Sequence, residues 1–160
     1  MDLLPFDRTH AVAVAGWPQS AAEVSMWCGL REFPLPARTV EAWQHADDVR
    51  AHLLLDGEQL IGYGELWIDA EEQEIELARI IVAPDARGKG YGRTLVRELT
   101  AQALLTGLPA IFMRVHPDND RALRCYRAAG FAPVDPRLAK SWNAVQPVAY
   151  VWLRHDEAAS

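Results

Sequence analysis

The sequence predicts one α+β (mixed α/β) domain whose central sheet has six or seven strands, mostly antiparallel, with one parallel strand-helix-strand crossover and about four flanking helices. Three observations carry this prediction. Helix signals dominate the first fifty residues, the hydrophobic period then changes to that of strands, and strand and helix segments alternate after residue 82. A chain of 160 residues also has the size of a single domain with one substantial core. We therefore treat residues 1–160 as one domain.

The first elements of the chain are short. We expect a strand over residues 2–7, followed by a helical piece that ends near Gly16. Ser20 and Glu23 have the spacing of a capping box, in which each side chain satisfies a backbone amide that the helix leaves free. This spacing predicts a helix that begins at these residues and runs through Trp27.

A helix and an antiparallel meander follow. Thr39 is expected to cap a helix that runs to about residue 46. Asp56 and Gly57 predict the first hairpin turn of the meander, and residues 69–72 predict the second. The strands of the meander are expected over residues 52–55, 60–68 and 74–82.

Helices and strands alternate after Pro84. Apolar side chains at four-residue spacing predict a helix from about Gly90 to Leu105. Asn119, near an N-cap, and Gly130, at a C′ position, delimit a later helix. That helix is expected over residues 118–129, and the remaining strands over residues 110–115, 131–134 and 148–153.

Charge is strongly segregated along the chain. Residues 86–127 carry a local charge of +5, whereas the whole chain carries −6, which leaves −11 for the remainder. Solvated arginines on helices explain part of the positive excess, and this reading comes first for Arg97, Arg124 and Arg127. The other reading is an anion-binding half joined to an acidic half that attracts a cationic partner.

Composition excludes several classes of protein. The net negative charge argues against a general nucleic-acid binder, and no apolar run approaches the roughly 20 residues of a membrane span. The N-terminal residues do not resemble a secretion signal, so a cytoplasmic location is expected. Cys28 and Cys125 are too few for a disulfide framework, and the five histidines have no paired metal spacing. We therefore expect no metal site and no membrane or nucleic-acid partner.

The segment from Asp85 to Gly92 has the features of a phosphate-binding loop. It lies between a strand and a helix, where free backbone amides and the positive end of the helix dipole face the same space. Neither the Walker pattern nor the dinucleotide-binding glycine pattern fits it. Three glycines let the backbone approach an anion and three basic side chains add charge; these residues are Gly88, Gly90, Gly92, Arg87, Lys89 and Arg93.

Two motifs occur together in the second half of the chain. The string RGKGYG at residues 87–92 follows a strand that ends in VAP, and the string NDRALRCYRAAGF occupies residues 119–131. Together they resemble the acyl-CoA signature and the second motif of the GNAT superfamily of N-acetyltransferases. The resemblance covers residues 58–131 well and both ends of the chain only in general layout, with the signature motifs within residues 74–131.

This resemblance implies acetyl-CoA as the acyl-donor co-substrate. Its pyrophosphate would lie on the glycine loop, and its pantetheine arm would pair with the main chain of the preceding strand. The Tyr126 hydroxyl would point at the sulfur, although the residues alone favour an aromatic side chain on the core face of its helix. The implied donor-binding residues are Ile80, Ile81, Val82, Arg87, Gly88, Lys89, Gly90, Tyr91, Gly92, Arg93 and Asn119.

Acetyl transfer to an amine needs a base and an acid. An amine with a pKa near that of lysine, about 10.4, is protonated at neutral pH, so a base should help. Glu76 is the candidate, because it precedes Arg87 by eleven residues, where some members of the superfamily carry a catalytic glutamate. The alternative for Glu76 is a solvated carboxylate at a strand edge, and Glu65 and Glu74 are reserves. Tyr126 can protonate the leaving thiolate.

Three further groups bear on the chemistry. A backbone amide near Val82 can polarise the acetyl carbonyl. Cys125 lies about 100° around its helix from Tyr126, so we expect a buried structural thiol and no covalent route. His116 follows a strand and could line the acceptor pocket.

We therefore expect an acetyl-CoA-dependent N-acetyltransferase that moves an acetyl group to a primary amine by direct attack in a ternary complex. The acceptor is expected to be a small-molecule or peptide amine, and cationic because most of the chain is acidic. The alternatives are a module that senses acyl-CoA without turnover, and an acyltransferase for another acyl group or for a protein N-terminus. Oligomeric state stays open, with a homodimer as one option.

Overall fold

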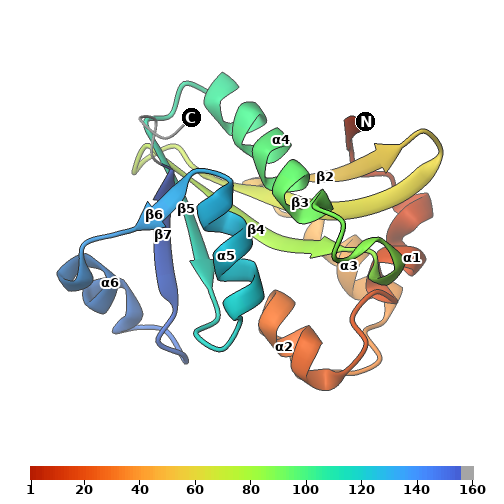
Figure 1. The fold of residues 1–160 in the computed structure, drawn as a ribbon, viewed down its shortest axis with the longest axis horizontal. Coiled ribbons are helices and arrows are strands. Elements are labelled where there is room, and N and C mark those ends of the chain that lie inside the picture. The colour runs from red at the N-terminus through yellow and green to blue at the C-terminus, as the bar shows by residue number, and fades with distance from the viewer. Residues whose placement is uncertain (156–160) are drawn as a thin grey trace.

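The centre of the computed structural model, which describes residues 1–155, is one seven-stranded sheet (Figure 1). The strands lie in the order β1-β2-β3-β4-β5-β7-β6, and every neighbouring pair is antiparallel except β4 and β5. The strands are β1 (Asp2–Pro5), β2 (Val49–Asp56), β3 (Gln59–Asp69), β4 (Glu74–Val82), β5 (Ala110–Val115), β6 (Phe131–Pro133) and β7 (Val151–His155).

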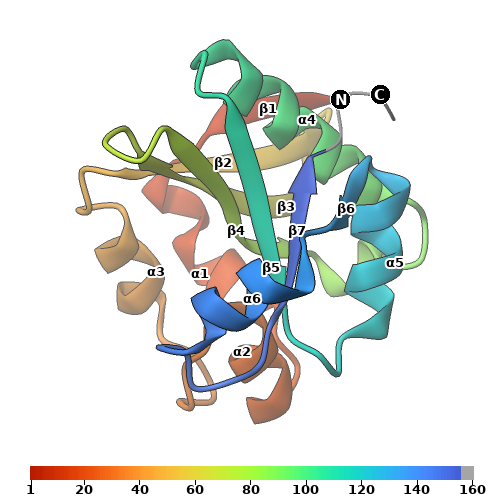
Figure 2. The same ribbon diagram turned by 90° about the vertical axis from the view of Figure 1, so that its left-hand side faces the viewer.

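Within the described residues, six α-helices and two short 3₁₀ helices connect these strands. Helices α4 and α5 lie on one side of the sheet, and α1, α2 and α3 lie on the other (Figure 2). The helices are η1 (Arg8–His10), α1 (Ala11–Ala15), α2 (Ala21–Cys28), α3 (Ala37–Trp43), η2 (Pro84–Ala86), α4 (Tyr91–Leu105), α5 (Asp120–Ala128) and α6 (Pro136–Asn143).

The predicted fold class is confirmed, with corrections at two helices. Thr39 does not cap α3, because Pro36 occupies the N-cap with φ −75° and ψ 146°, an extended conformation that the proline ring favours. Helix α6 is absent from the sequence prediction. It begins at Pro136, and the carboxylate of Asp135 caps it by accepting a hydrogen bond from the Arg137 amide at 2.8 Å.

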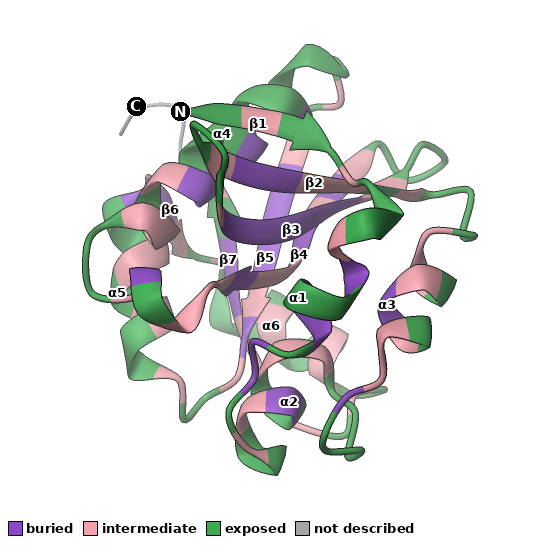
Figure 3. Cartoon of the chain, turned by 90° about the vertical axis from the view of Figure 1, so that its right-hand side faces the viewer, coloured by how far each residue is buried: buried purple, intermediate pink, exposed green. Residues whose placement is uncertain are grey.

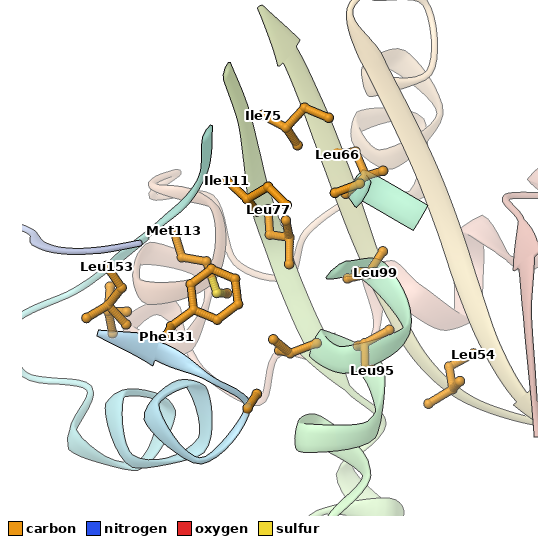
Figure 4. Close-up of a cluster of buried hydrophobic side chains, with 14 of the residues drawn as sticks. Leu54, Leu66, Ile75, Leu77, Leu95, Leu99, Ile111, Met113, Phe131 and Leu153 are labelled. Atoms are coloured by element: carbon orange, nitrogen blue, oxygen red, sulfur yellow. The ribbon is translucent and has the colours of Figure 1, made fainter. Parts of the chain in front are cut away.

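Helix α4 packs on the sheet through its apolar stripe. Leu95 and Leu99 are fully buried against residues of β2, β3 and β4 (Figure 4). The contact is close at Gly64, where an added Cβ atom would lie 2.5 Å from Leu99 Cδ1. This packing fixes the position of the N-terminus of α4 beside the end of β4.

A second core lies under α1, α2 and α3. Val14, Val24 and Val40, one from each helix, are fully buried with Tyr63 of β3. Figure 3 shows buried residues along the strands and exposed residues on the outer sides of these helices. The helices therefore cover the face of the sheet opposite α4 and α5.

Strands β4 and β5 separate part-way along their length. They pair in parallel from Glu74 and Ala110 to Leu77 and Met113, and no pairing follows. The register between β3 and β4 shifts at the same level, because two residues of β4, Arg79 and Ile80, oppose the single residue Gly64 of β3, which is a β-bulge. The last residues of β4 therefore border a gap instead of a strand on the side of β5.

Candidate active site

A cavity of about 480 Å³ lies where β4 and β5 separate. The end of β4, the glycine loop with the first turn of α4, helix α5 and one side of α2 form its walls. We call it the loop cavity, and it is lined by residues 23, 26–27, 79–82, 86–88, 90–93, 114–116, 119, 121–122, 125–126 and 128.

Two glycines of the glycine loop have a backbone conformation that other residues disfavour. Gly88 and Gly90 have φ values of +76° and +85°, a left-handed conformation that costs side-chain-bearing residues roughly 1–2 kcal/mol. Gly90 is the N-cap of α4, and no side chain caps the helix. The first amides of α4 are therefore free to bind an anion in the loop cavity.

Most of the predicted donor-binding residues lie together here. Ten of the eleven line the loop cavity, and the eleventh, Lys89, is exposed elsewhere on the loop. Asn119 caps α5 by accepting a hydrogen bond from the Ala122 amide at 3.2 Å, so its carbonyl oxygen is already used. Its amide nitrogen is the group that a ligand in the cavity could contact.

Arg87 is engaged within the protein. Its guanidinium donates to Glu23 Oε1 at 2.6 Å, to the Val82 carbonyl at 3.1 Å and to the Trp17 carbonyl at 3.3 Å. These bonds join the glycine loop to α2 and to the end of β4. Two of its five N–H groups stay available for a ligand.

The charged side chains that line the loop cavity are mainly basic. Glu23 is its one acidic residue within the described chain, whereas the basic lining residues are Arg79, Arg87, Arg93, Arg114 and Arg121. Sequence reasoning did not assign Arg121 to the site. Arg121 lies in the first turn of α5, two residues after Asn119, and this position in the motif could have indicated that it belongs to the site. Its side chain reaches the glycine loop, since its Nη2 would lie 3.5 Å from a Cβ atom added at Gly88.

Tyr126 lines the loop cavity from α5 and also packs against the main core. Burial, with a smaller effect of Cys125, raises the pKa of its hydroxyl above the usual value of 10, so it stays protonated at neutral pH. Cys125 also lines the cavity and is only partly buried, which corrects the expectation of a buried structural thiol. The cavity extends along and around α5 toward Gly92, where an added Cβ atom would lie 3.2 Å from Cys125 Sγ.

Glu76 and Tyr126 line different cavities. Glu76 does not line the loop cavity, and its carboxylate accepts two hydrogen bonds from Arg114, at 2.7 Å from Nε and 2.9 Å from Nη2. Arg114 does line the loop cavity. The reserve candidate Glu65 is fully buried and lines neither cavity described here.

A second cavity, of about 490 Å³, lies on the other side of the Glu76–Arg114 pair. Burial, followed by the nearby Glu72, Asp69 and Glu76, raises the pKa of the Glu74 carboxyl. No arginine or lysine of the described chain lines this cavity. We call it the acidic cavity; its carboxylates are Asp48, Asp69, Glu74 and Glu76, and its aromatic walls are Trp67, Phe112, Trp142 and Trp152.

No group of three or more histidine, cysteine, aspartate or glutamate side chains among residues 1–155 is arranged to hold a metal ion. None of the helices in that range has the length and apolar character needed to cross a bilayer.

Comparison with known proteins places this geometry in a family. The model of the acetyltransferase (GNAT) family matches residues 19–131, which include the glycine loop, the end of β4 and α5. The chain belongs to the GNAT family. A mycothiol acetyltransferase of Jonesia denitrificans is 33% identical over 121 residues, which are 74% of this chain and 37% of that relative. The GNAT domain described here therefore spans little more than a third of that relative's length.

Solved structures share the GNAT fold. A spermidine N-acetyltransferase from Vibrio cholerae in complex with CoA and spermine has a TM-score of 0.72 at 21% identity, over 96% of this chain and 92% of that chain. AAC(6')-Ib in complex with ribostamycin and coenzyme A has a TM-score of 0.77 at 19% identity, over 98% and 93% of the two chains. At these identities the similarity shows the fold.

GNAT acetyltransferases use acetyl-CoA as acyl donor, and the residues of this chain fit such a ligand. Free amides at the start of α4 and basic side chains suit a pyrophosphate. The unpaired edge of β4 beyond Leu77 suits an extended, amide-containing arm. Both features lie in one cavity.

Proposed function

We propose that the chain is an acetyl-CoA-dependent N-acetyltransferase that acetylates a primary amine by direct attack. One observation carries the proposal: the loop cavity joins an amide-rich, basic loop at one end to the protonated hydroxyl of Tyr126 in its wall. The separation of β4 and β5 supplies the space between them.

The donor would be held by backbone and charge. The amides of Tyr91, Gly92 and Arg93 would bind its pyrophosphate, with Arg121 and the free N–H groups of Arg87 adding charge. Ile80, Ile81 and Val82 would pair with its pantetheine arm through their main chain, with Asn119 beside them. The two fold neighbours that were solved in complex with coenzyme A support this placement by their shared fold.

In the reaction, the protein would donate one proton, accept another and stabilise the carbonyl oxygen. The amine nitrogen attacks the thioester carbonyl, whose oxygen accepts a hydrogen bond from a backbone amide near Val82. As the carbon–sulfur bond breaks, Tyr126 donates its proton to the departing thiolate. The proton that the amine loses passes to Glu76, directly or through water. No enzyme nucleophile takes part, so Cys125 serves as a wall of the cavity.

The acceptor would be a cationic amine that approaches from the acidic cavity. Carboxylates and aromatic faces both attract ammonium groups, and this cavity has both. Glu76 lines the acidic cavity and its partner Arg114 lines the loop cavity, so their ion pair borders both the acceptor side and the donor side. The spermine and ribostamycin bound by the fold neighbours support an amine acceptor in general.

Two measurements test the proposal. Calorimetry should show CoA binding, and mass spectrometry should show an acetylated product when cationic amines are supplied with acetyl-CoA, with propionyl-CoA and succinyl-CoA as donors to compare. Absence of heat at millimolar CoA, in a sample verified as folded, would overturn donor binding. CoA binding without release stimulated by any amine would instead favour the acyl-CoA sensor, and product with neutral amines alone would refute the cationic acceptor.

A further inference from the structure

Arg79 has a backbone conformation that its residue type disfavours. Arg79 lies in β4 and has a φ of +48°. Among the non-glycine residues of the described chain, only Gln73, in the hairpin turn before β4, also has a positive φ. A left-handed conformation costs a residue with a Cβ atom roughly 1–2 kcal/mol and persists only where the surroundings impose it. The surroundings of Arg79 therefore need an explanation.

The strained residue lies at the point where the sheet opens. Pairing between β4 and β5 ends at Leu77, and the register shift against β3 falls between Ala78 and Ile81. Arg79 is thus part of the β-bulge that directs the end of β4 away from β5. Arg79 itself lines the loop cavity that occupies the gap.

Side-chain contacts hold Arg79 from three sides. Its guanidinium carbon lies 4.0 Å from the ring centroid of Trp43 on α3 and 4.9 Å from that of Trp67 on β3. Its Nη1 donates to Glu65 Oε1 at 2.9 Å. A planar cation between two indole rings and a carboxylate has one favourable position, which a flexible ammonium would not share.

Glu65 is fixed just as firmly. Its carboxylate is fully buried and accepts hydrogen bonds from Tyr63 Oη, from Trp67 Nε1 at 2.7 Å and from Arg79. Tyr63 in turn accepts a hydrogen bond from Gln44 Nε2 at 3.1 Å. A buried carboxylate without a cation is strongly unfavourable, so Glu65 requires Arg79 at this place.

We propose that Arg79 and Glu65 are positioning residues that lock the β4 bulge and thereby set the gap in which the acyl donor binds. The pair acts through the backbone of residues 80–82 and takes no part in the chemistry. The link to catalysis rests on the proposed function, whereas the lock itself is a property of the fold.

The test compares Arg79→Lys, Arg79→Gly and Glu65→Gln with the control Gln73→Gly. Arg79→Gly relieves the backbone strain but removes the guanidinium, whereas Arg79→Lys keeps a charge without the planar fork. In hydrogen-exchange mass spectrometry, we expect amides of residues 80–82 to exchange at least about tenfold faster in all three variants, with no change in Gln73→Gly. Unchanged protection in Arg79→Gly or Arg79→Lys would overturn the lock, whether or not the protein binds CoA.

CoA affinity supplies the second readout. Calorimetry should show Kd raised at least about tenfold in Arg79→Gly and Glu65→Gln, and no further increase in the double variant, because the two residues act as one unit. Wild-type affinity in folded variants with lowered Tm would assign the pair to stability alone and refute the positioning role. If a single variant fails to fold, Trp43→Phe removes part of one stacking contact, and a Kd increase of about twofold to threefold is expected; no increase would count against the proposal.

Discussion

Arg87 Nη1 lies 2.6 Å from Glu23 Oε1, an ion pair that joins the glycine loop to α2 across 64 positions of the sequence. Glu23 Oε2 also accepts a hydrogen bond from the Gln19 amide at 2.8 Å. The carboxylate that helps to begin α2 therefore also orients an arginine of the donor site. Residues outside the signature motifs thus shape the loop that those motifs define.

Loss of this ion pair should weaken donor binding. We expect Glu23→Gln to raise the Kd for CoA by about fivefold, which corresponds to about 1 kcal/mol for a partly exposed pair. The control is Glu41→Gln, because Glu41 pairs with Arg8 at 3.8 Å on the surface and should leave the Kd unchanged. Tighter CoA binding in Glu23→Gln would contradict the expectation, since it would mean that Arg87 binds phosphate better when released.

The glycine loop should be sensitive to a single added methyl group. Gly90→Ala places a Cβ atom at φ +85°, and we expect a stability loss of about 1 kcal/mol with a Kd for CoA raised at least about fivefold. Gly57→Ala is a matched control, because Gly57 has φ +60° in a hairpin turn and, like Gly90, has open space around it. It should lose similar stability with no change in Kd. Equal effects on Kd in both variants would show that strain alone is responsible.

Tyr126 should affect turnover and not donor binding. If its hydroxyl protonates the thiolate, Tyr126→Phe lowers kcat by about 10²–10⁴ while the Kd for CoA changes less than twofold. Cys125→Ala, which alters the adjacent wall of the cavity, should keep kcat within about twofold. Steady-state kinetics with a reactive amine measures both. A kcat in Tyr126→Phe close to that of the parent protein would remove the tyrosine from the mechanism.

Glu76 should act on the acceptor side of the reaction. We expect Glu76→Gln to lower kcat by about 10²-fold without changing the Kd for CoA, because the amide cannot accept a proton. Glu74→Gln, in the same acidic cavity, should mainly raise KM for a cationic amine. If both variants changed only KM, Glu76 would be a binding residue that orients Arg114.

Stability should fall in alkaline solution. Burial, and for Tyr63 also the neighbouring Glu65, raises the pKa of Tyr63 and Tyr126 above the usual value of 10. A group whose pKa is higher in the folded state contributes stability below the unfolded pKa and loses it as pH rises further. The urea midpoint should therefore drop between pH 9 and pH 11. Tyr126→Phe should show a smaller drop, and an equal drop would contradict its burial in the folded protein.

The elements that short-range sequence patterns determine were predicted best. The sheet meander, the glycine loop and α4 follow from hydrophobic period and turn residues, and Asn119 caps α5 as its position predicts. Helix α6 was missed because Asp135 followed by Pro136 is typical of a turn as well as of a helix start. Local patterns cannot choose between these outcomes, which depend on how the segment packs.

Sequence reasoning could predict those parts of the candidate site whose residues lie close together in the sequence, such as the glycine loop. The partner of Glu76 is Arg114, 38 positions later, and no periodicity links them. The same holds for Arg79 and Glu65, which meet only because β3 and β4 pair with a bulge between them. Charge counting indicated an acidic region, but only the fold gathers its carboxylates and tryptophans around one cavity.

The position of β7 has a consequence for synthesis on the ribosome. β7 lies between β5 and β6, although both are translated before it. Phe112 therefore has no partner across that edge until Arg154 has been synthesised, and the edge of β5 stays open while residues 116–150 are added. A translation product that stalls between β6 and β7 would therefore expose an unpaired, aggregation-prone edge of β5.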